Sequence, residues 1–173
     1  ATAYQANMGD SENIRTVFGK ILEDFGQVHC LINNAGIVST APFDEVTQAE
    51  WDRVIAINLT GVYTAISVMY PAMKAAGYGR IVNVASVAAK RGGGLLGTSA
   101  YAASKAGVIG LTKAVAREGA PYGVACNGVC PSLTITPMTC HLGEEKMQKI
   151  ISTIPMGRGA QPQEIANMIL FYA

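Results

Sequence analysis

The sequence predicts an α/β fold in which helices cover both faces of a parallel sheet. Strand-like and helix-like segments alternate along all 173 residues, which is the order that parallel strands with crossover helices require. The strand-like segments are nearly continuous apolar runs, as expected for strands buried on both faces. No internal repeat or low-complexity linker divides the chain, so residues 1–173 are interpreted as a single domain.

The chain opens with a predicted strand and an amphipathic helix. Residues 2–7 alternate like a strand. Asp10 or Ser11 can then cap a helix whose apolar residues recur every three or four positions as far as Phe25. Gly26 follows as a typical helix stop.

A second strand, over residues 28–32, leads into a longer helix. Thr47 and Glu50 have the spacing of a capping box, in which two side chains bond each other's backbone N–H groups at a helix start. The helix that follows, over 51–75, presents a broad apolar face. It carries one amide, Asn58, among apolar and small residues.

The second half of the chain continues the alternation. The expected strands lie over residues 80–85 and 124–130, and the expected helices over 101–118, 144–152 and 162–172.

A glycine-rich stretch over residues 92–97 matches the G-x-G-x-x-G pattern of dinucleotide-binding turns. That pattern belongs in the first tight strand-to-helix turn, with an acidic residue about 20 positions later on a strand. Here the glycines lie well beyond their strand, and the acid at the right distance, Glu118, ends a helix. We therefore interpret the stretch as a loop beside an active site.

Composition restricts the class of function. The chain has 13 Lys+Arg against 12 Asp+Glu and is 50% hydrophobic, which argues against disorder and against a nucleic-acid partner. No apolar run approaches the length of a membrane span, and no signal peptide precedes the first helix, so neither a membrane nor secretion is expected. The four cysteines and two histidines lack the spacing of a metal site. Reduced thiols, no bound metal and a cytoplasmic location are therefore expected.

Several polar side chains are placed to form a catalytic centre. Tyr101 and Lys105 are four residues apart on one predicted helix and share a face. Ser86 ends the preceding strand and Asn34 follows the strand before it, where parallel sheets place their ligands. Asn58 needs either a hydrogen bond or a function inside its apolar helix. Taken singly, these residues also fit a surface pair, a strand-end cap and a packing amide.

Together, these motifs resemble the short-chain dehydrogenase/reductase family of the classical type, and its 3-oxoacyl-acyl-carrier-protein reductases in particular. The resemblance covers essentially the whole chain, and the motifs occur in family order. The matching motifs are Asn33-Asn34-Ala35-Gly36, Ile57-Asn58-Leu59-Thr60-Gly61, Asn83-Val84-Ala85-Ser86, Tyr101-x-x-x-Lys105, Pro131-Ser132-Leu133-Thr134-Ile135-Thr136 and Pro155-Met156-Gly157-Arg158.

The resemblance implies a Rossmann-like doubly wound sheet and an oxidoreductase that uses NAD or NADP. Such an enzyme moves a hydride between the nicotinamide and a 3-oxoacyl thioester, a sugar or polyol, or a simple secondary alcohol. Tyr101 would be the general acid or base, and Lys105 would lower its pKa from near 10 towards neutrality. Ser86 would hydrogen-bond the substrate oxygen, and Asn58 would hold a water linked to Lys105.

By the same resemblance, a set of residues from several loops would contact the cofactor. Ser132 stands where the family usually has glycine, so we expect an altered backbone there, because residues other than glycine tolerate positive φ poorly. The implied cofactor contacts are Asn7, Met8, Asn34, Ala35, Gly36, Tyr101, Lys105, Pro131, Thr134 and Thr136.

The family pattern also includes segments that these 173 residues do not contain. The family begins with a strand, a T-G-x-x-x-G-x-G loop and a second strand that distinguishes NAD from NADP, and it ends with a further strand. We therefore expect the first strands and the last strand of the fold to be missing. On this expectation, the chain alone should bind the nicotinamide cofactor weakly.

An alternative to an enzyme is a non-catalytic remnant that binds other proteins through the helices over 51–75 and 101–118. The retention of Asn58, Ser86, Tyr101 and Lys105 favours the enzyme, because a binding module has no use for this set. Since the family assembles through the same helices, a homodimer or homotetramer is expected in either case.

Overall fold

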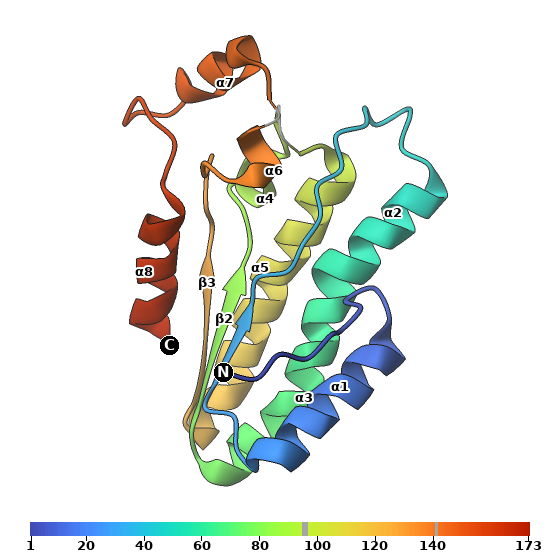
Figure 1. The fold of residues 1–173 in the computed structure, drawn as a ribbon, viewed down its shortest axis with the longest axis vertical. Coiled ribbons are helices and arrows are strands. Elements are labelled where there is room, and N and C mark those ends of the chain that lie inside the picture. Colours follow the sequence, from blue (N-terminus) through green and yellow to red (C-terminus); the bar gives the residue numbers. More distant parts are fainter. Residues whose placement is uncertain (95–96, 141) are drawn as a thin grey trace.

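The computed structural model describes residues 1–94, 97–140 and 142–173, which form a three-stranded sheet with helices around it (Figure 1). All strands are parallel and are hydrogen-bonded in sequence order. The register places Asn33 of the first strand beside Asn83 of the second. The strands are β1 (Cys30–Asn33), β2 (Gly79–Val84) and β3 (Val124–Val129).

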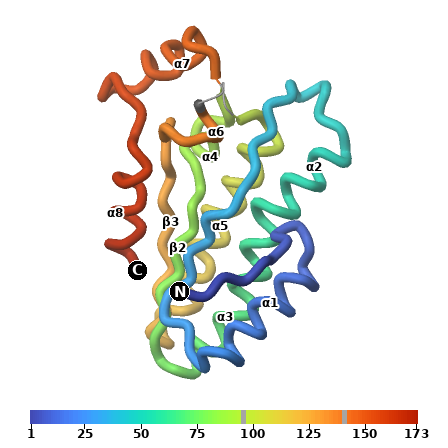
Figure 2. Tube along the Cα trace, in the orientation of Figure 1, coloured from blue at the N-terminus to red at the C-terminus, as the bar shows by residue number. Residues whose placement is uncertain are grey.

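Helices cover both faces of this sheet, as the sequence predicts. Helices α1, α3 and α5 lie on one face, and α8 lies against β2 and β3 on the other (Figures 1 and 2). The short helices α4, α6 and α7 gather at the end where the strands finish (Figure 1). The helices are α1 (Ser11–Phe25), α2 (Gln48–Ile55), α3 (Gly61–Ala76), α4 (Ala88–Arg91), α5 (Ser99–Gly119), α6 (Pro137–Cys140), α7 (Glu144–Ile151) and α8 (Pro162–Tyr172).

Helix α1 begins and ends where its sequence predicts. The carboxylate of Asp10 accepts hydrogen bonds from the backbone N–H groups of Glu12 and Asn13. Gly26 ends the helix with φ at 70°, a conformation that glycine adopts at little cost. Between these caps, Ile14 is fully buried against the rest of the core.

The helix predicted over 51–75 is interrupted. Thr47 caps its start by accepting the N–H of Glu50, as half of the predicted capping box. A π-helical segment, Ala56–Thr60, then separates α2 from α3 and contains Asn58. Apolar spacing did not reveal this wider turn, because the apolar face of the helix is broad and a change of phase leaves no clear mark on it.

The main hydrophobic core lies between the sheet and the helices α1, α3 and α5. Its fully or nearly fully buried members come from all three strands and helices on that side. They include Ile14, Leu31, Ile66, Met69, Met73, Ile81, Val108 and Val124.

A chain of buried polar side chains crosses the sheet near the carboxyl ends of β1 and β2. The Nδ2 of Asn33 donates to Oδ1 of Asn83 at 2.8 Å, and Nδ2 of Asn83 donates to Oγ1 of Thr112 at 3.0 Å. The Asn83 amide is also within hydrogen-bonding distance of the Cys126 sulfur. These bonds satisfy polar groups that would otherwise be costly to bury, and they tie α5 to all three strands.

The prediction of a strand over residues 2–7 is wrong. None of the described residues forms a ladder with this segment, and a strand exists only where a neighbour pairs with its backbone. Tyr4 instead donates to Asp24 of α1 at 2.6 Å, so the segment is held by a side chain. The short helices α4 and α6 and the 3₁₀ helix Ala120–Tyr122 were not predicted, because they are too short to show a periodic pattern.

By length and composition alone, the helical stretch Gln48–Ala76 could cross a membrane. Its apolar composition has a different explanation here. Val62, Ile66 and Met69 are buried in the core, where α3 packs against α1 and the sheet. This is the environment of a core helix.

Candidate active site

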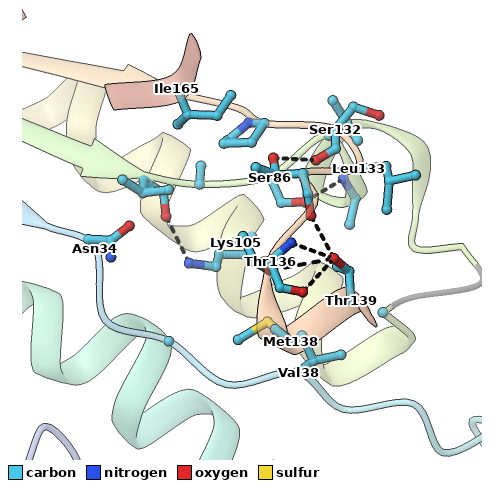
Figure 3. A pocket seen from close by; sticks show the side chains of 18 of the residues that line it. Asn34, Val38, Ser86, Lys105, Ser132, Leu133, Thr136, Met138, Thr139 and Ile165 are labelled. Atoms are coloured by element: carbon cyan, nitrogen blue, oxygen red, sulfur yellow. Dashed lines mark hydrogen bonds between the residues drawn. The ribbon is translucent and has the colours of Figure 1, made fainter. Parts of the chain in front are cut away.

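A cavity of about 1440 Å³ opens at the carboxyl ends of the strands. Residues that follow each strand meet there with the start of α5, and α6, α7 and α8 contribute to its wall. Figure 3 shows Ser86, Lys105 and, from α8, Ile165 around this cavity. Most of the residues that the sequence assigns to catalysis or cofactor binding line this cavity. They are Asn34, Ala35, Gly36, Ser86, Tyr101, Lys105, Pro131, Thr134 and Thr136.

Lys105 is a buried cation at the base of the cavity. Its side chain, on α5, donates from Nζ to the carbonyl oxygen of Val84 at 2.8 Å, and the residue is only 4% exposed (Figure 3). Burial lowers the pKa of Lys105 to about 8, against a smaller opposing effect of Cys130. Lys105 therefore titrates much nearer to neutrality than an exposed lysine.

Gly36 brings two of the predicted catalytic residues close to the loop after β1. A Cβ atom at this position would lie 3.2 Å from Oδ1 of Asn58 and 3.3 Å from Nζ of Lys105. Both distances are tighter than ordinary packing contacts. A glycine here thus allows the backbone to approach both polar groups.

Tyr101 and Ser86 face each other in the cavity. The Ser86 hydroxyl accepts the N–H of Ala88 at 3.1 Å and is hydrogen-bonded to the Tyr101 phenol. Burial raises the pKa of Tyr101, and the bond to Ser86 offsets part of that rise.

The predicted lowering of the Tyr101 pKa by Lys105 is therefore not found. Nζ of Lys105 lies 5.9 Å from the centroid of the Tyr101 ring, and its hydrogen bond goes to Val84. Burial, which disfavours the phenolate, is the larger influence.

Asn58 is fully buried and hydrogen-bonded to protein groups. Its Oδ1 accepts the N–H of Ile37 at 2.8 Å, and its Nδ2 donates to the carbonyl of Ile37 at 2.9 Å and to Oγ of Ser104 at 3.1 Å. Ser104 in turn donates to the carbonyl of Tyr101 at 2.7 Å. Asn58 thus joins the loop after β1 to the helix that carries Tyr101, a connection that the sequence did not reveal.

Asn7 and Met8 do not line the cavity. The side-chain oxygen of Asn7 accepts the N–H of Gly9 at 3.0 Å, and its backbone N–H donates to Asn13 at 2.8 Å. Met8 packs against the hydrophobic core. The structure therefore separates these two predicted cofactor contacts from the others.

The backbone at Ser132 does not adopt a positive φ, and no other non-glycine residue in the described part of the chain does so. This agrees with the expectation that serine avoids a conformation that glycine tolerates.

Thr139 is a structural residue of the site that sequence reasoning missed. Its buried hydroxyl contacts the carbonyls of Thr134 and Thr136 at 2.7 and 3.0 Å and accepts the N–H of Thr136 at 2.9 Å (Figure 3). These bonds fix the loop that carries two predicted cofactor contacts. In the sequence, the sign of these bonds is that Thr139 lies three residues after Thr136 and five residues after Thr134.

Ser39 forms a second unpredicted junction. Its buried hydroxyl donates to Oε1 of Glu50 at 2.6 Å, and its carbonyl accepts both the N–H and the hydroxyl of Thr98, at 3.0 and 3.2 Å. Glu50 therefore bonds Ser39 and does not complete the capping box with Thr47. Because Thr98 is the N-cap of α5, this junction connects the loop after β1 to the turn that precedes Tyr101.

The glycine-rich loop borders the cavity, as predicted. Gly93, Gly94 and Gly97 line it, whereas residues 95–96 lie outside the described part of the chain. A side chain at Gly97 would overlap the ring of Tyr101. The glycine there leaves the space that the Tyr101 ring occupies.

Comparisons with known proteins agree on one family. The family described as short chain dehydrogenase matches residues 1–147. The 3-oxoacyl-(acyl-carrier-protein) reductase FabG of Thermotoga maritima is 41% identical over 98% of this chain and 68% of its own length. The acetoacetyl-CoA reductase of Rhizobium meliloti is 40% identical over 89% of this chain and 64% of its own length.

A solved structure gives the same answer for the fold. It is a Beutenbergia cavernae protein assigned as an NAD(P)-dependent gluconate 5-dehydrogenase, with NADP bound at low occupancy. Its TM-score is 0.94 at 37% identity, over 100% of this chain and 69% of that chain. The chain thus spans about two thirds of the length of these relatives.

Proposed function

Because this chain belongs to the short-chain dehydrogenase family, we propose that it transfers a hydride between NAD or NADP and a carbonyl or secondary-alcohol substrate. The observation that carries this proposal is that Ser86, which follows β2, meets Tyr101 and Lys105 of α5 in one cavity. A proton donor, a hydrogen-bond donor and a buried cation are the groups that carbonyl reduction requires.

The residues that border the cavity fit a nicotinamide cofactor. The close approach at Gly36 provides backbone surface on one side, and Pro131, Thr134 and Thr136 provide a polar wall from the loop after β3. When bound, the cofactor supplies or accepts the hydride. Lys105 and the loop residues Asn34 to Gly36 would hold it on the side of α5.

The protonation states at the site favour reduction near neutral pH. The raised pKa of Tyr101 keeps its phenol protonated, so Tyr101 can give that proton to the oxygen of a carbonyl as negative charge develops there. The Ser86 hydroxyl would donate a hydrogen bond to the same oxygen. Lys105, which lines the same cavity, would help to hold the cofactor. Reversal of these steps gives alcohol oxidation, in which Tyr101 must first lose its proton.

Replacement of the phenol tests this proposal. Tyr101→Phe in the full-length protein is expected to lower kcat by about two to four orders of magnitude, because the proton donor is lost while the ring remains. Turnover would be followed by nicotinamide absorbance with 3-oxo thioesters, sugars and simple ketones as substrates.

The control is Tyr63→Phe, which removes a hydroxyl from an exposed tyrosine of α3. Cofactor affinity, measured by fluorescence titration, should remain similar in both variants. Undiminished turnover in Tyr101→Phe would refute the role of Tyr101.

A further inference from the structure

The cavity is positively charged. Among the described residues that line it, the ionisable side chains are Arg91, Tyr101 and Lys105, and no aspartate, glutamate or histidine is present. Lys105 is buried and already donates to Val84. Arg91 is therefore the charged side chain at the cavity that remains open to a ligand.

The side chain of Arg91 is exposed and its guanidinium has no hydrogen bond or ion pair with the described residues. Its guanidinium differs in this respect from that of Arg158, which forms two hydrogen bonds of 2.7 and 2.8 Å with Glu164. An arginine without a carboxylate partner, at the edge of a cavity, suits a bidentate contact with an anionic ligand.

The backbone holds Arg91 at a fixed place relative to the proposed reaction centre. Helix α4 starts at Ala88, whose N–H donates to the Ser86 hydroxyl, and Arg91 at its end donates its own N–H to the carbonyl of Val87 at 3.1 Å. Ser86 precedes α4 and Arg91 ends it, so the whole of this short helix separates the two residues. A group bound by Arg91 would thus lie several bonds away from a carbonyl held by Ser86.

The surroundings leave room for such a group. The chain turns at Gly92 and Gly93, with φ of 79° and 107°, and Gly93 and Gly94 line the cavity without side chains. Met138, Leu142 and Ile150 form an apolar part of the same lining. A substrate whose carbonyl is held by Ser86 and whose far end is held by Arg91 could lay its carbon chain against this apolar wall.

We propose that Arg91 binds an anionic group on the substrate, so that the enzyme prefers oxo or hydroxy compounds with a carboxylate or phosphate several bonds from the reacting carbon. This inference rests on the proposed function and adds the substrate class. The shared chemistry is a planar or tetrahedral oxyanion that accepts two N–H groups from the guanidinium.

The test compares charged and neutral forms of the same substrates in the full-length protein. A series of oxo carboxylates of increasing chain length would be assayed beside their ethyl esters and beside oxo phosphates. In Arg91→Gln, kcat/KM for the best anionic substrate should fall at least about tenfold, since a charge-assisted hydrogen bond is lost. The value for its neutral ester should change little.

Lys90→Gln is the matched control, because it removes the same charge from the neighbouring exposed residue, which does not line the cavity. It should leave the preference for anions unchanged. In the wild type, a higher kcat/KM for the carboxylates than for the phosphates, or the reverse, identifies which oxyanion Arg91 binds.

Three results would overturn the inference. One is an equal loss with anionic and neutral substrates in Arg91→Gln. Another is a rise in the KM of the cofactor with no change in substrate preference, which would assign Arg91 to a cofactor phosphate. The third is equal affinity of wild type and Arg91→Gln for the carboxylates by calorimetry. Calorimetry needs no turnover, so it separates a failure of this inference from a failure of the proposed function.

Discussion

Lys105 shows how a single residue sets the electrostatics of this site. Its ammonium is 4% exposed, and its hydrogen bond to the Val84 carbonyl replaces only part of the water it loses. The consequence is a pKa of about 8 in the folded chain against 10.5 for an unperturbed lysine. The protein therefore carries a destabilising buried charge at neutral pH, next to the proposed proton donor.

This burial predicts that stability increases with pH above neutrality. Below about pH 8, Lys105 is protonated in both the folded and the unfolded chain, so its contribution is constant. Between pH 8 and 10.5 the unfolded chain binds more protons, so the unfolding free energy should rise, by about 3 kcal/mol in all. Urea denaturation of wild type and Lys105→Met across this range measures the difference. If the two stabilities change in parallel, the cost assigned to Lys105 is wrong.

At this scale the sequence located the residues but not their partners. The spacing of Tyr101 and Lys105 placed both on one face of α5, and both line the cavity. It did not predict that Lys105 bonds Val84, or that Asn58 bonds both backbone groups of Ile37. Those partners depend on how closely the loop after β1 approaches α5, which no local pattern records.

Among the elements, the loop from β1 to α2 is fixed most strongly by side chains. Asn58 binds its backbone at Ile37, and Ser39 connects it to Glu50 of α2 and to Thr98 at the start of α5. The loop therefore connects α2 to the start of α5, the helix that carries Tyr101.

Loss of the Ser39 hydroxyl should affect both stability and turnover. Ser39→Ala leaves the carboxylate of Glu50 without its 2.6 Å donor, so unfolding should become easier by about 1–3 kcal/mol. Because the junction precedes Tyr101, kcat should fall more than KM rises. Thermal unfolding and steady-state kinetics would measure these effects.

Two further variants separate positioning from general destabilisation. Glu50→Gln retains an acceptor for the Ser39 hydroxyl, so its kcat should stay close to that of the wild type. Ser152→Ala, which removes an exposed hydroxyl from the end of α7, should change neither quantity. A fall in stability with unchanged kcat in Ser39→Ala would limit Ser39 to a structural role.

Element boundaries were predictable where a cap or a glycine marks them. Asp10 and Gly26 bound α1 as their residue types suggest. The strand over residues 2–7 was wrong, because strand pairing is set by neighbouring chain segments. The helix over 51–75 was correct, since one helical stretch spans Gln48–Ala76, but its π-helical turn at Ala56–Thr60 was not predicted. Local propensity carries no information on either.

At the scale of the whole molecule, α8 and α5 both present residues to the solvent. On α8, Leu170 and Phe171 are 74% and 78% exposed. On α5, the outward face is a row of small residues that includes Ala103, Ala106 and Gly110. A row of this kind permits close approach of another helix, which agrees with the proposal of a homodimer or homotetramer built through α3 and α5.

Gly110 allows this assembly to be tested without disturbing the fold. A side chain there would meet no atom within 4 Å, so Gly110→Arg should fold normally while its bulk blocks a second helix. The molar mass by light scattering should fall to that of a smaller assembly. Gly19→Arg on α1, where a side chain also meets nothing within 4 Å, is the matched control. An unchanged mass in Gly110→Arg would place the interface elsewhere.

The π-helical segment Ala56–Thr60 has a consequence for the angular phase of the long helix. Each residue turns an α-helix by about 100°, so deletion of one residue that restored regular α-helix would rotate all of α3 by that angle relative to α2. The deletion would turn Met69 and Ile66 away from the core or take Asn58 away from Ile37. A π-helical turn contains one residue more than an α-helical turn. That residue allows the same long helix to point its α3 side chains into the core and to point Asn58 at the loop after β1.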